Sequence, residues 1–334
     1  MKLCIIFLMS LLTQIFGLLH RCPHVKHFPE EQLKQHKANF FNFCDCQKHQ
    51  NSSVFVTCQG LKTRENLTMA LNFLRGYFID ELTIRRSSSL HLTAGTFKGL
   101  HIHKLIFDDT RFETLILFSA FKGLEFELYE LNFLKCRINN IVFQKGIQFT
   151  YMNTLIFEKT NLLPKMNDNI FKKFPSKLRN LKITGCNVQE FGNQALKKFS
   201  HLETVDLGEN HLTKISRSMF PRPARRLRYL SLTSNPITEL PDDLFENMER
   251  LEFLLLSDTR ISVLSNNTFF PVWQQLEEVY MNNVKLNCDC NILWMLEKSD
   301  ASIIKKPFCI SHNRGLNDIR NPNEICPPRR TRKI

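Results

Sequence analysis

Glycine and proline are scarce in this chain, which contains 11 Gly and 13 Pro among its 334 residues. That scarcity excludes a collagen-like chain and most low-complexity classes. Hydrophobic residues make up 43% of the sequence and charged residues 23%, which provides enough apolar mass to bury a core and excludes a disordered polymer. The length suits either two ordinary domains or one long solenoid.

The signatures of common enzymes are missing as well. The sequence has no His-Glu-x-x-His zinc motif, no Gly-Lys-Ser/Thr phosphate loop, no Gly-x-Ser-x-Gly nucleophile elbow and no calcium loop. His101 and His103 flank the start of an expected strand, where solvated histidines are far commoner than metal ligands. The sequence therefore predicts a protein that is not an enzyme and that holds neither a cofactor nor a metal.

Long apolar runs are limited to the N-terminus. Lys2 precedes a largely apolar stretch that ends at Gly17, which is typical of a secretory signal peptide and too short for a comfortable membrane span. The last residues, 329–334, are mostly basic, so no apolar tail suggests a lipid anchor. We predict a signal peptide over residues 1–20 and a secreted, extracellular product without a membrane span.

Cysteine is the residue type that most needs an explanation, since the chain has eleven. Cys4 lies in the predicted signal peptide, and Cys136 and Cys186 stand alone in the middle. The other eight form one group near each end: Cys22, Cys44, Cys46 and Cys58, and Cys288, Cys290, Cys309 and Cys326. In an oxidising compartment these groups predict two disulfide-bonded caps rather than zinc sites. Spacing alone allows three connectivities for four cysteines.

Internal repeats set the expected architecture. The pattern Leu-x-x-Leu-x-Leu-x-x-Asn-x-Leu begins at Leu202 and again at Leu227. Looser copies begin at Ile79, Ile102, Leu128, Met152, Leu178, Leu251 and Leu276, so that nine starts are spaced 23 to 26 residues apart. Such a period predicts stacked coils, each a short strand with a return segment, whose Leu positions share one continuous core. A Phe that recurs on the return segments predicts a second buried column.

One position of the repeat has its own chemistry. Asn210 and Asn235 occupy a corner where a side chain must bond to backbone groups left unpaired by the turn. Cys136 and Cys186 fall at the same corner, which predicts free, buried thiols. A bridge between them would span two strand spacings, ~9–10 Å, which exceeds the ~7 Å limit between Cα atoms of a disulfide.

The repeats and the two cysteine groups together resemble extracellular leucine-rich repeat proteins with cysteine-rich caps. The resemblance covers about residues 54–326, and Cys288-Asp289-Cys290 followed by Trp294 closely resembles the C-terminal cap. It implies the pairs Cys288–Cys309 and Cys290–Cys326, and Cys22–Cys46 and Cys44–Cys58 in the N-terminal cap. The segment between Cys22 and Cys44 is longer than usual for the family and predicts a short helix after Pro29. The layout most resembles secreted arthropod members, including chains similar to the non-catalytic subunit of shrimp luciferase.

The expected fold is an α/β leucine-rich repeat solenoid, or horseshoe, with short parallel strands on the concave face and disulfide-capped ends. We divide the chain into a signal peptide (1–20), an N-terminal cap (21–78), about nine repeats (79–286), a C-terminal cap (287–327) and a basic tail (328–334). The resemblance implies recognition of an extracellular protein or glycan through the concave face. The alternatives are a proteoglycan-like matrix scaffold that binds acidic polysaccharide and a soluble Toll-like recognition ectodomain of innate immunity.

Because strand side chains alternate, the residues of the concave face can be named in advance. One column runs from Thr83 to Tyr280 and the column beside it from Glu81 to Glu278. Most members are polar, but four large residues cluster on the last three strands: Tyr229, Phe253, Leu255 and Tyr280. Contiguous exposed aromatics predict a partner-binding site. The alternative is that the C-terminal cap or a sugar chain covers them.

The charge excess is uneven along the chain. The formal net charge is +13, and residues 305–334 contribute +6 of it through eight basic and two acidic residues. The tail residues Arg329, Arg330, Arg332 and Lys333 could bind acidic polysaccharide, or could simply form a solvated end. Three Asn-x-Ser/Thr sequons, at Asn51, Asn66 and Asn266, are predicted glycosylation sites. Nothing in the sequence suggests a nucleic-acid partner.

Overall fold

A computed structural model describes residue 22 and residues 43–48, 53–144, 148–297, 303–305, 307–319 and 321–326. The predicted signal peptide, the helix expected after Pro29, the sequon at Asn51 and the basic tail lie outside these residues. The chain divides into two compact units, unit 1 (Met1–Asn161) and unit 2 (Leu162–Ile334).

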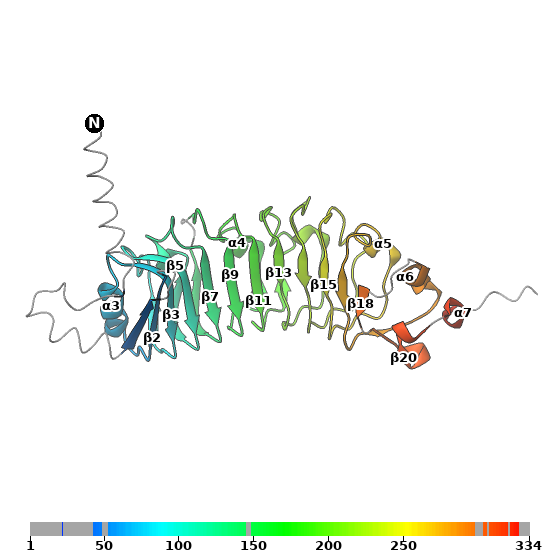
Figure 1. The fold of residues 1–334 in the computed structure, drawn as a ribbon, viewed down its shortest axis with the longest axis horizontal. Helices are drawn as coiled ribbons and strands as arrows, with labels where there is room; N and C mark the ends of the chain where they lie inside the picture. The colour runs from blue at the N-terminus through cyan, green and yellow to red at the C-terminus, as the bar shows by residue number, and fades with distance from the viewer. Residues whose placement is uncertain are drawn as a thin grey trace, which may run out of the picture. The chain divides into compact units, whose positions relative to one another are not determined.

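The main sheet of unit 1 is built from one strand of each coil (Figure 1). Its strands, in spatial order, are β1 (Cys44–Lys48), β2 (Val54–Gln59), β3 (Phe78–Arg85), β5 (His101–Asp108), β7 (Glu130–Leu134) and β9 (Thr154–Glu158). β1 is antiparallel to β2, and every later pair is parallel. The parallel sheet thus begins one strand before the first predicted repeat.

Unit 1 also has a second sheet, which the sequence did not predict. Three strands of the return segments pair in parallel: β4 (Leu90–Leu92), β6 (Arg111–Leu117) and β8 (Arg137–Phe143). In β6, Phe112, Leu115 and Leu117 are fully buried, so this sheet closes the core opposite the main sheet. Burial of such side chains stabilises each coil by roughly 1.5–3 kcal/mol per residue relative to exposure.

Phenylalanine rings connect successive coils inside unit 1. Phe107 stacks on Phe133 with ring centroids 5.2 Å apart, and Phe133 stacks on Phe157 at 5.0 Å. Phe97 and Phe121, from the return segments, contact this column and are fully buried. The predicted Phe column of the return segments is therefore present, and a further column runs along the strands.

Helix α3 (Arg64–Phe73) lies between β2 and β3 in unit 1. The Thr63 hydroxyl caps it by accepting a hydrogen bond from the Asn66 amide at 3.2 Å. Its inner face buries Leu67 and Leu71. A short 3₁₀ turn, η2 (Ser119–Phe121), completes the return segment after β6.

The main sheet of unit 2 continues the same design (Figure 1). Its strands are β11 (Asn180–Thr184), β13 (Thr204–Asp206), β14 (Tyr229–Ser231), β15 (Phe253–Leu255), β16 (Glu278–Tyr280) and β18 (Ile304–Lys305), all parallel to their neighbours. Its return segments hold β10 (Lys165–Met166) paired with β12 (Glu190–Phe191), and the short helices α4 (Asp168–Phe171), η3 (Arg217–Met219) and α5 (Asn266–Phe269). β18 adds a strand beyond the last predicted repeat.

The corner ladder forms in both units. Asn210 accepts hydrogen bonds from the amides of Cys186 and Val188, and its own amide group donates to three backbone carbonyls. Cys136 donates its S–H to the carbonyls of Phe107 and Leu134. Both lone cysteines are buried and neither forms a disulfide, as predicted, and burial raises the pKa of the Cys136 thiol to about 12.

Four disulfides close the ends of the repeat stack, with the pairs that the resemblance implied: Cys22–Cys46, Cys44–Cys58, Cys288–Cys309 and Cys290–Cys326. The C-terminal part comprises β17 (Lys285–Leu286), η4 (Cys290–Ile292), α6 (Leu293–Glu297), β19 (Phe308–Cys309), η6 (Ile310–His312), β20 (Arg314–Gly315), η7 (Leu316–Asp318) and α7 (Pro322–Ile325). The Trp294 ring lies 4.9 Å from that of Trp273 and 5.7 Å from that of Phe269. Trp294 thus covers the apolar end of the last coil.

Candidate functional site

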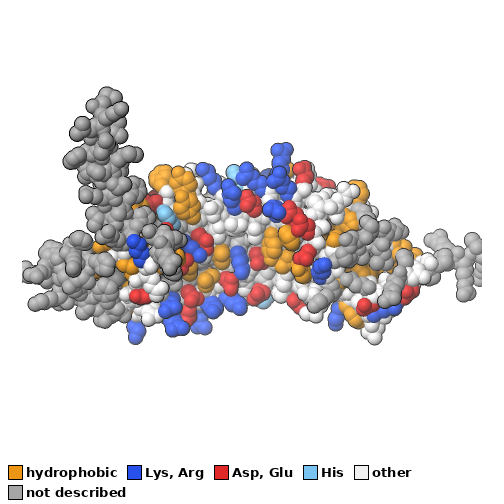
Figure 2. Space-filling view, in the orientation of Figure 1, with side chains coloured by type: hydrophobic (Ala, Val, Ile, Leu, Met, Phe, Trp, Pro, Cys, Tyr) orange, Lys and Arg blue, Asp and Glu red, His pale blue; other side chains and the backbone are white. Residues whose placement is uncertain are grey.

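The four large residues predicted on the sheet face of unit 2 lie together. Tyr229 pairs in register with Phe253, and Leu255 pairs with Tyr280. All four side chains are half-exposed. We call Tyr229, Phe253, Leu255 and Tyr280 the aromatic patch, and Figure 2 shows hydrophobic side chains gathered in the region of β15.

The alternation of each strand explains why these residues face outward. The central residues of β14, β15 and β16 are Leu230, Leu254 and Val279, and all three are fully buried. The residues on either side of them must therefore point to the opposite face. With neighbouring strands ~4.8 Å apart, outward side chains at one register contact one another. The core thus needs none of the four patch residues.

Two carboxylates border the aromatic patch. The Tyr280 hydroxyl donates a hydrogen bond of 2.6 Å to Glu278 Oε2, and this bond raises the pKa of Tyr280. Burial, followed by the negative charge of Asp206, raises the pKa of Tyr229. Both phenols are therefore neutral at physiological pH. The patch presents flat apolar rings beside two acceptors, Asp206 and Glu278.

The sheet face of unit 1 is different, because its side chains neutralise one another. Lys104 Nζ lies 3.3 Å from Glu81 Oε2 and 3.3 Å from Glu130 Oε1. Burial acts to lower the pKa of Lys104, but the charges of Glu130 and Glu81 outweigh it and raise the pKa. Asn132 Nδ2 donates to Glu130 Oε1 at 2.7 Å. These polar side chains therefore pair with one another, and the half-exposed Ile106 and Ile156 lie in the column beside them.

Unit 1 carries exposed aromatics elsewhere, which the sequence analysis missed. Phe126 is 72% exposed, and the Tyr129 ring lies 5.7 Å from that of Tyr151. These residues precede the strands β7 and β9, so the repeat pattern assigned them to connecting segments. An inspection of the residue just before each strand would have found Tyr129.

His101 and His103, which the sequence analysis expected to be solvated, each lie beside a carboxylate. His101 Nδ1 lies 2.7 Å from Glu127 Oε1, and His103 Nδ1 lies 3.6 Å from Asp80 Oδ1. Within the described ranges, no group of three or more His, Cys, Asp or Glu residues could hold a metal ion. The same part of the chain contains no helix long and apolar enough to cross a membrane.

Two of the three sequons can be located. Asn266 is exposed and opens α5, while the hydroxyl of Thr268 in the same sequon is buried and donates to the Pro241 carbonyl. Asn66 is half-buried in the first turn of α3, and its Oδ1 accepts from the Lys62 amide at 3.4 Å. Glycosylation at either site stays a prediction.

Comparison with known proteins agrees with this architecture. Residues 114–252 match the family described as BspA type leucine rich repeat region, and residues 225–281 match the leucine rich repeat family. No curated protein sequence matches, so the expected likeness to a luciferase subunit finds no support.

Solved structures share the fold. One is the octameric complex of Latrophilin 3, Unc5D and FLRT2 (LRR). The protein is similar to a chain of this complex with a TM-score of 0.59 and 16% sequence identity, and the match covers 84% of this chain and 99% of that one. Another is the TLR13–ssRNA13 complex, with a TM-score of 0.57 and 18% identity, covering 75% of this chain and 34% of that one. At these identities the likeness concerns the fold alone.

Proposed function

We propose that this chain, a leucine-rich repeat protein with disulfide-bonded ends, is a non-enzymatic recognition module that binds an extracellular protein or glycan through the aromatic patch. The observation that carries the proposal is the clustering of four large half-exposed residues on three adjacent strands. Contiguous apolar surface of this kind is retained where a partner covers it. Tyrosine in particular is enriched among the residues that dominate binding energy.

The chemistry of the patch indicates what its ligand carries. The rings of Tyr229 and Phe253 would cover an apolar side chain or the apolar face of a sugar ring. Asp206 and Glu278 border the rings, but Lys182 pairs in register with Asp206 and Lys305 with Tyr280, so the patch favours neither sign of charge in its ligand.

Secretion is the second part of the proposal. The apolar N-terminal stretch is typical of a signal peptide, and the four disulfides need an oxidising compartment to form. Expression with the natural N-terminus in cultured eukaryotic cells tests this part. The processed protein should accumulate in the medium, with a new N-terminus between residues 17 and 21.

A site-specific crosslink tests the binding surface. Phe253 is replaced with the photoreactive residue p-benzoylphenylalanine, and the protein is irradiated in extracellular fluid of its source. The matched control carries the same residue in place of Phe270, which is 67% exposed but directly follows α5 and does not belong to a strand of the sheet. A discrete adduct should form from position 253 only, and Leu255→Asp should abolish it. Equal adducts from both positions, or an adduct insensitive to Leu255→Asp, would contradict the proposal.

Binding of acidic polysaccharide by the tail is an independent candidate, favoured by the net charge of +6 in residues 305–334. Retention on a heparin column should decrease when residues 328–334 are removed. Elution of both forms at the same salt concentration would rule out polysaccharide binding by the tail.

A soluble Toll-like ectodomain would lose its ligand on Phe253→Ala or Tyr280→Ala.

A further inference from the structure

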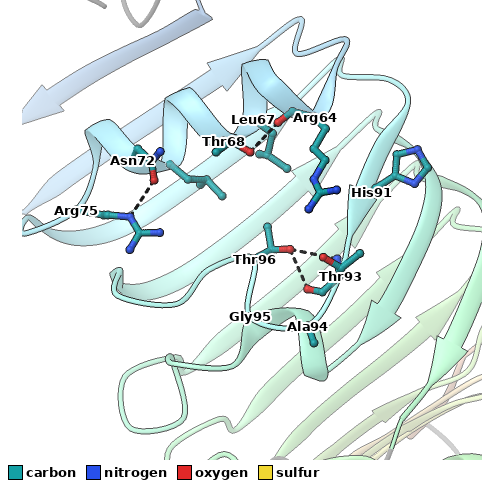
Figure 3. Close-up of a pocket in the computed structure, with 11 residues that line it drawn as sticks. Arg64, Leu67, Thr68, Asn72, Arg75, His91, Thr93, Ala94, Gly95 and Thr96 are labelled. Carbon is teal, nitrogen blue, oxygen red and sulfur yellow. Dashed lines mark hydrogen bonds between the residues drawn. The ribbon is translucent and has the colours of Figure 1, made fainter. Parts of the chain in front are cut away.

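Unit 1 contains a polar pocket of about 180 Å³ between α3 and the turn that follows β4 (Figure 3). Such a volume is far larger than a single water molecule needs. Helix α3 forms one wall with Arg64, Thr68 and Arg75, the last of which lies just beyond the C-terminal end of the helix. The opposite wall comes from β4 and its turn, with His91 and the segment Thr93–Thr96.

The ionisable side chains that line this pocket are all basic. Arg64, Arg75 and His91 line it, and no carboxylate does. Within the part of the chain that the structure describes, neither guanidinium makes an ion pair with a carboxylate. Glu65 is next to Arg64 in sequence, and its pKa is lowered by hydrogen bonds from its own amide and from Thr63 and, to a smaller extent, by the charge of Arg64, but Glu65 does not line the pocket.

Several contacts hold the walls in place. Arg75 Nε donates to Asn72 Oδ1 at 3.0 Å, which orients the guanidinium. Gly99 leaves room for that group, since a Cβ atom there would lie 3.0 Å from Arg75 Nη1. On the other side, the Thr96 hydroxyl donates to the Thr93 carbonyl at 2.8 Å and accepts from the Thr93 amide at 3.1 Å. The positive groups are therefore attached to a pocket whose shape is already set.

We propose that this pocket binds a sulfate or phosphate monoester carried on a group of about the size of a sugar ring. Arginine forks match the oxygens of such esters and bind them through paired hydrogen bonds. The two arginines come from the α3 wall and His91 from the opposite wall. A tetrahedral ester presents oxygens in several directions, whereas a carboxylate presents two in one plane. The pocket volume beyond the ester accommodates the ring that carries it.

The site is separate from the aromatic patch and does not depend on the proposed function. A negatively charged ligand suits this pocket, whereas the patch presents apolar rings. Helix geometry also keeps the pocket clear of the predicted glycan at Asn66. Residues 64, 68 and 75 share one face of α3 and its extension, and residue 66 lies two positions from Arg64, about 200° around the helix.

Calorimetric titration of the full, disulfide-bonded protein tests the proposal with three probes: N-acetylglucosamine 6-sulfate, glucose 6-phosphate and glucuronate. One of the two esters should bind with a dissociation constant of roughly 0.1–1 mM, a moderate affinity because the lining groups are open to water. The double variant Arg64→Gln/Arg75→Gln should weaken it at least tenfold. Gln at position 64 removes a positive charge from the first turn of a helix, so the variant should not be less stable for that reason.

The matched control is Arg111→Gln/Arg137→Gln, which removes the same charge from exposed positions of unit 1 outside the pocket. It should change ester affinity less than twofold, and both double variants should keep the thermal midpoint of the parent. The ester that binds identifies the source as sulfated or phosphorylated. Equal weakening in the control, equal binding of glucuronate, or no ester binding at millimolar concentration would overturn the proposal.

Discussion

Replacement of Asn210 by Ala is the sharpest test of how the coils of unit 2 are joined. The Asn210 side chain is 3% exposed. Its Oδ1 accepts from the amides of Cys186 and Val188, each at 3.1 Å. Its Nδ2 donates to the carbonyls of Ile183 at 2.7 Å and Leu207 at 3.0 Å. It also donates to the carbonyl of Gly208 at 3.0 Å, so two of the three carbonyls share one hydrogen. One side chain therefore bonds backbone groups of two neighbouring coils.

The size of the effect follows from that inventory. Two accepted and two donated hydrogen bonds contribute about 1 kcal/mol each, and buried groups left without a partner cost more than the bond they lose. We expect Asn210→Ala to reduce the free energy of unfolding by roughly 3–5 kcal/mol. Asn210→Cys should lose less, because the Cys136 thiol shows that sulfur can donate at this corner, with an Sγ to Phe107 O distance of 3.4 Å.

Urea unfolding with the disulfides intact measures the total effect, and amide hydrogen exchange locates it. The exchange protection of the Cys186 and Val188 amides should fall first, since these two lose their acceptor. Asn193→Ala is the control, because Asn193 is exposed. A loss below about 1 kcal/mol, or unchanged protection of both amides, would refute the argument that the ladder joins the coils.

Two further changes probe the interior. Burial raises the pKa of Cys136 from 9.0 to about 12, so the thiol of the unfolded chain loses its proton at a lower pH than that of the folded chain. The free energy of unfolding should therefore fall by about 1.4 kcal/mol per pH unit between roughly pH 9 and 12. Cys136→Thr should remove that part of the slope in rapid urea titrations at pH 8 to 11. Gly192→Ala would place a Cβ atom against the side-chain carboxylate and the backbone amide of Asp168. The variant should reduce the free energy of unfolding by about 1–3 kcal/mol in the same assay. An unchanged free energy of unfolding would show that the two coils can move apart at this point without cost.

Much of the sheet could be predicted because one spacing determines it. Once Leu207 and Leu232 are placed at equivalent positions, alternation assigns every outward residue, and the registers confirm the two columns in each unit. The resemblance also implied the four disulfide pairs. It could do so because each pair joins residues within or beside a single terminal coil.

The return segments were harder to predict, because their structure depends on stacking. The second sheet of unit 1 consists of short segments such as Leu90–Leu92, whose alternation is too brief to distinguish a strand from a loop. Only the neighbouring coil supplies the hydrogen bonds that make it a strand. The pocket beside α3 was missed for the same reason, since Arg64 and His91 are 27 positions apart and line one pocket only when the coils stack.

The two sheet faces show why the aromatic patch calls for a functional explanation. On the face of unit 1, the outward charges of Glu81, Lys104 and Glu130 pair with one another, and the large aromatic side chains of the aromatic patch have no counterpart among them. On the face of unit 2, the outward positions at Phe253 and Leu255 hold apolar side chains while the inward positions already fill the core. Folding does not require these side chains, and exposing them favours aggregation. A binding partner accounts for their presence, whereas the stability of the repeat stack does not.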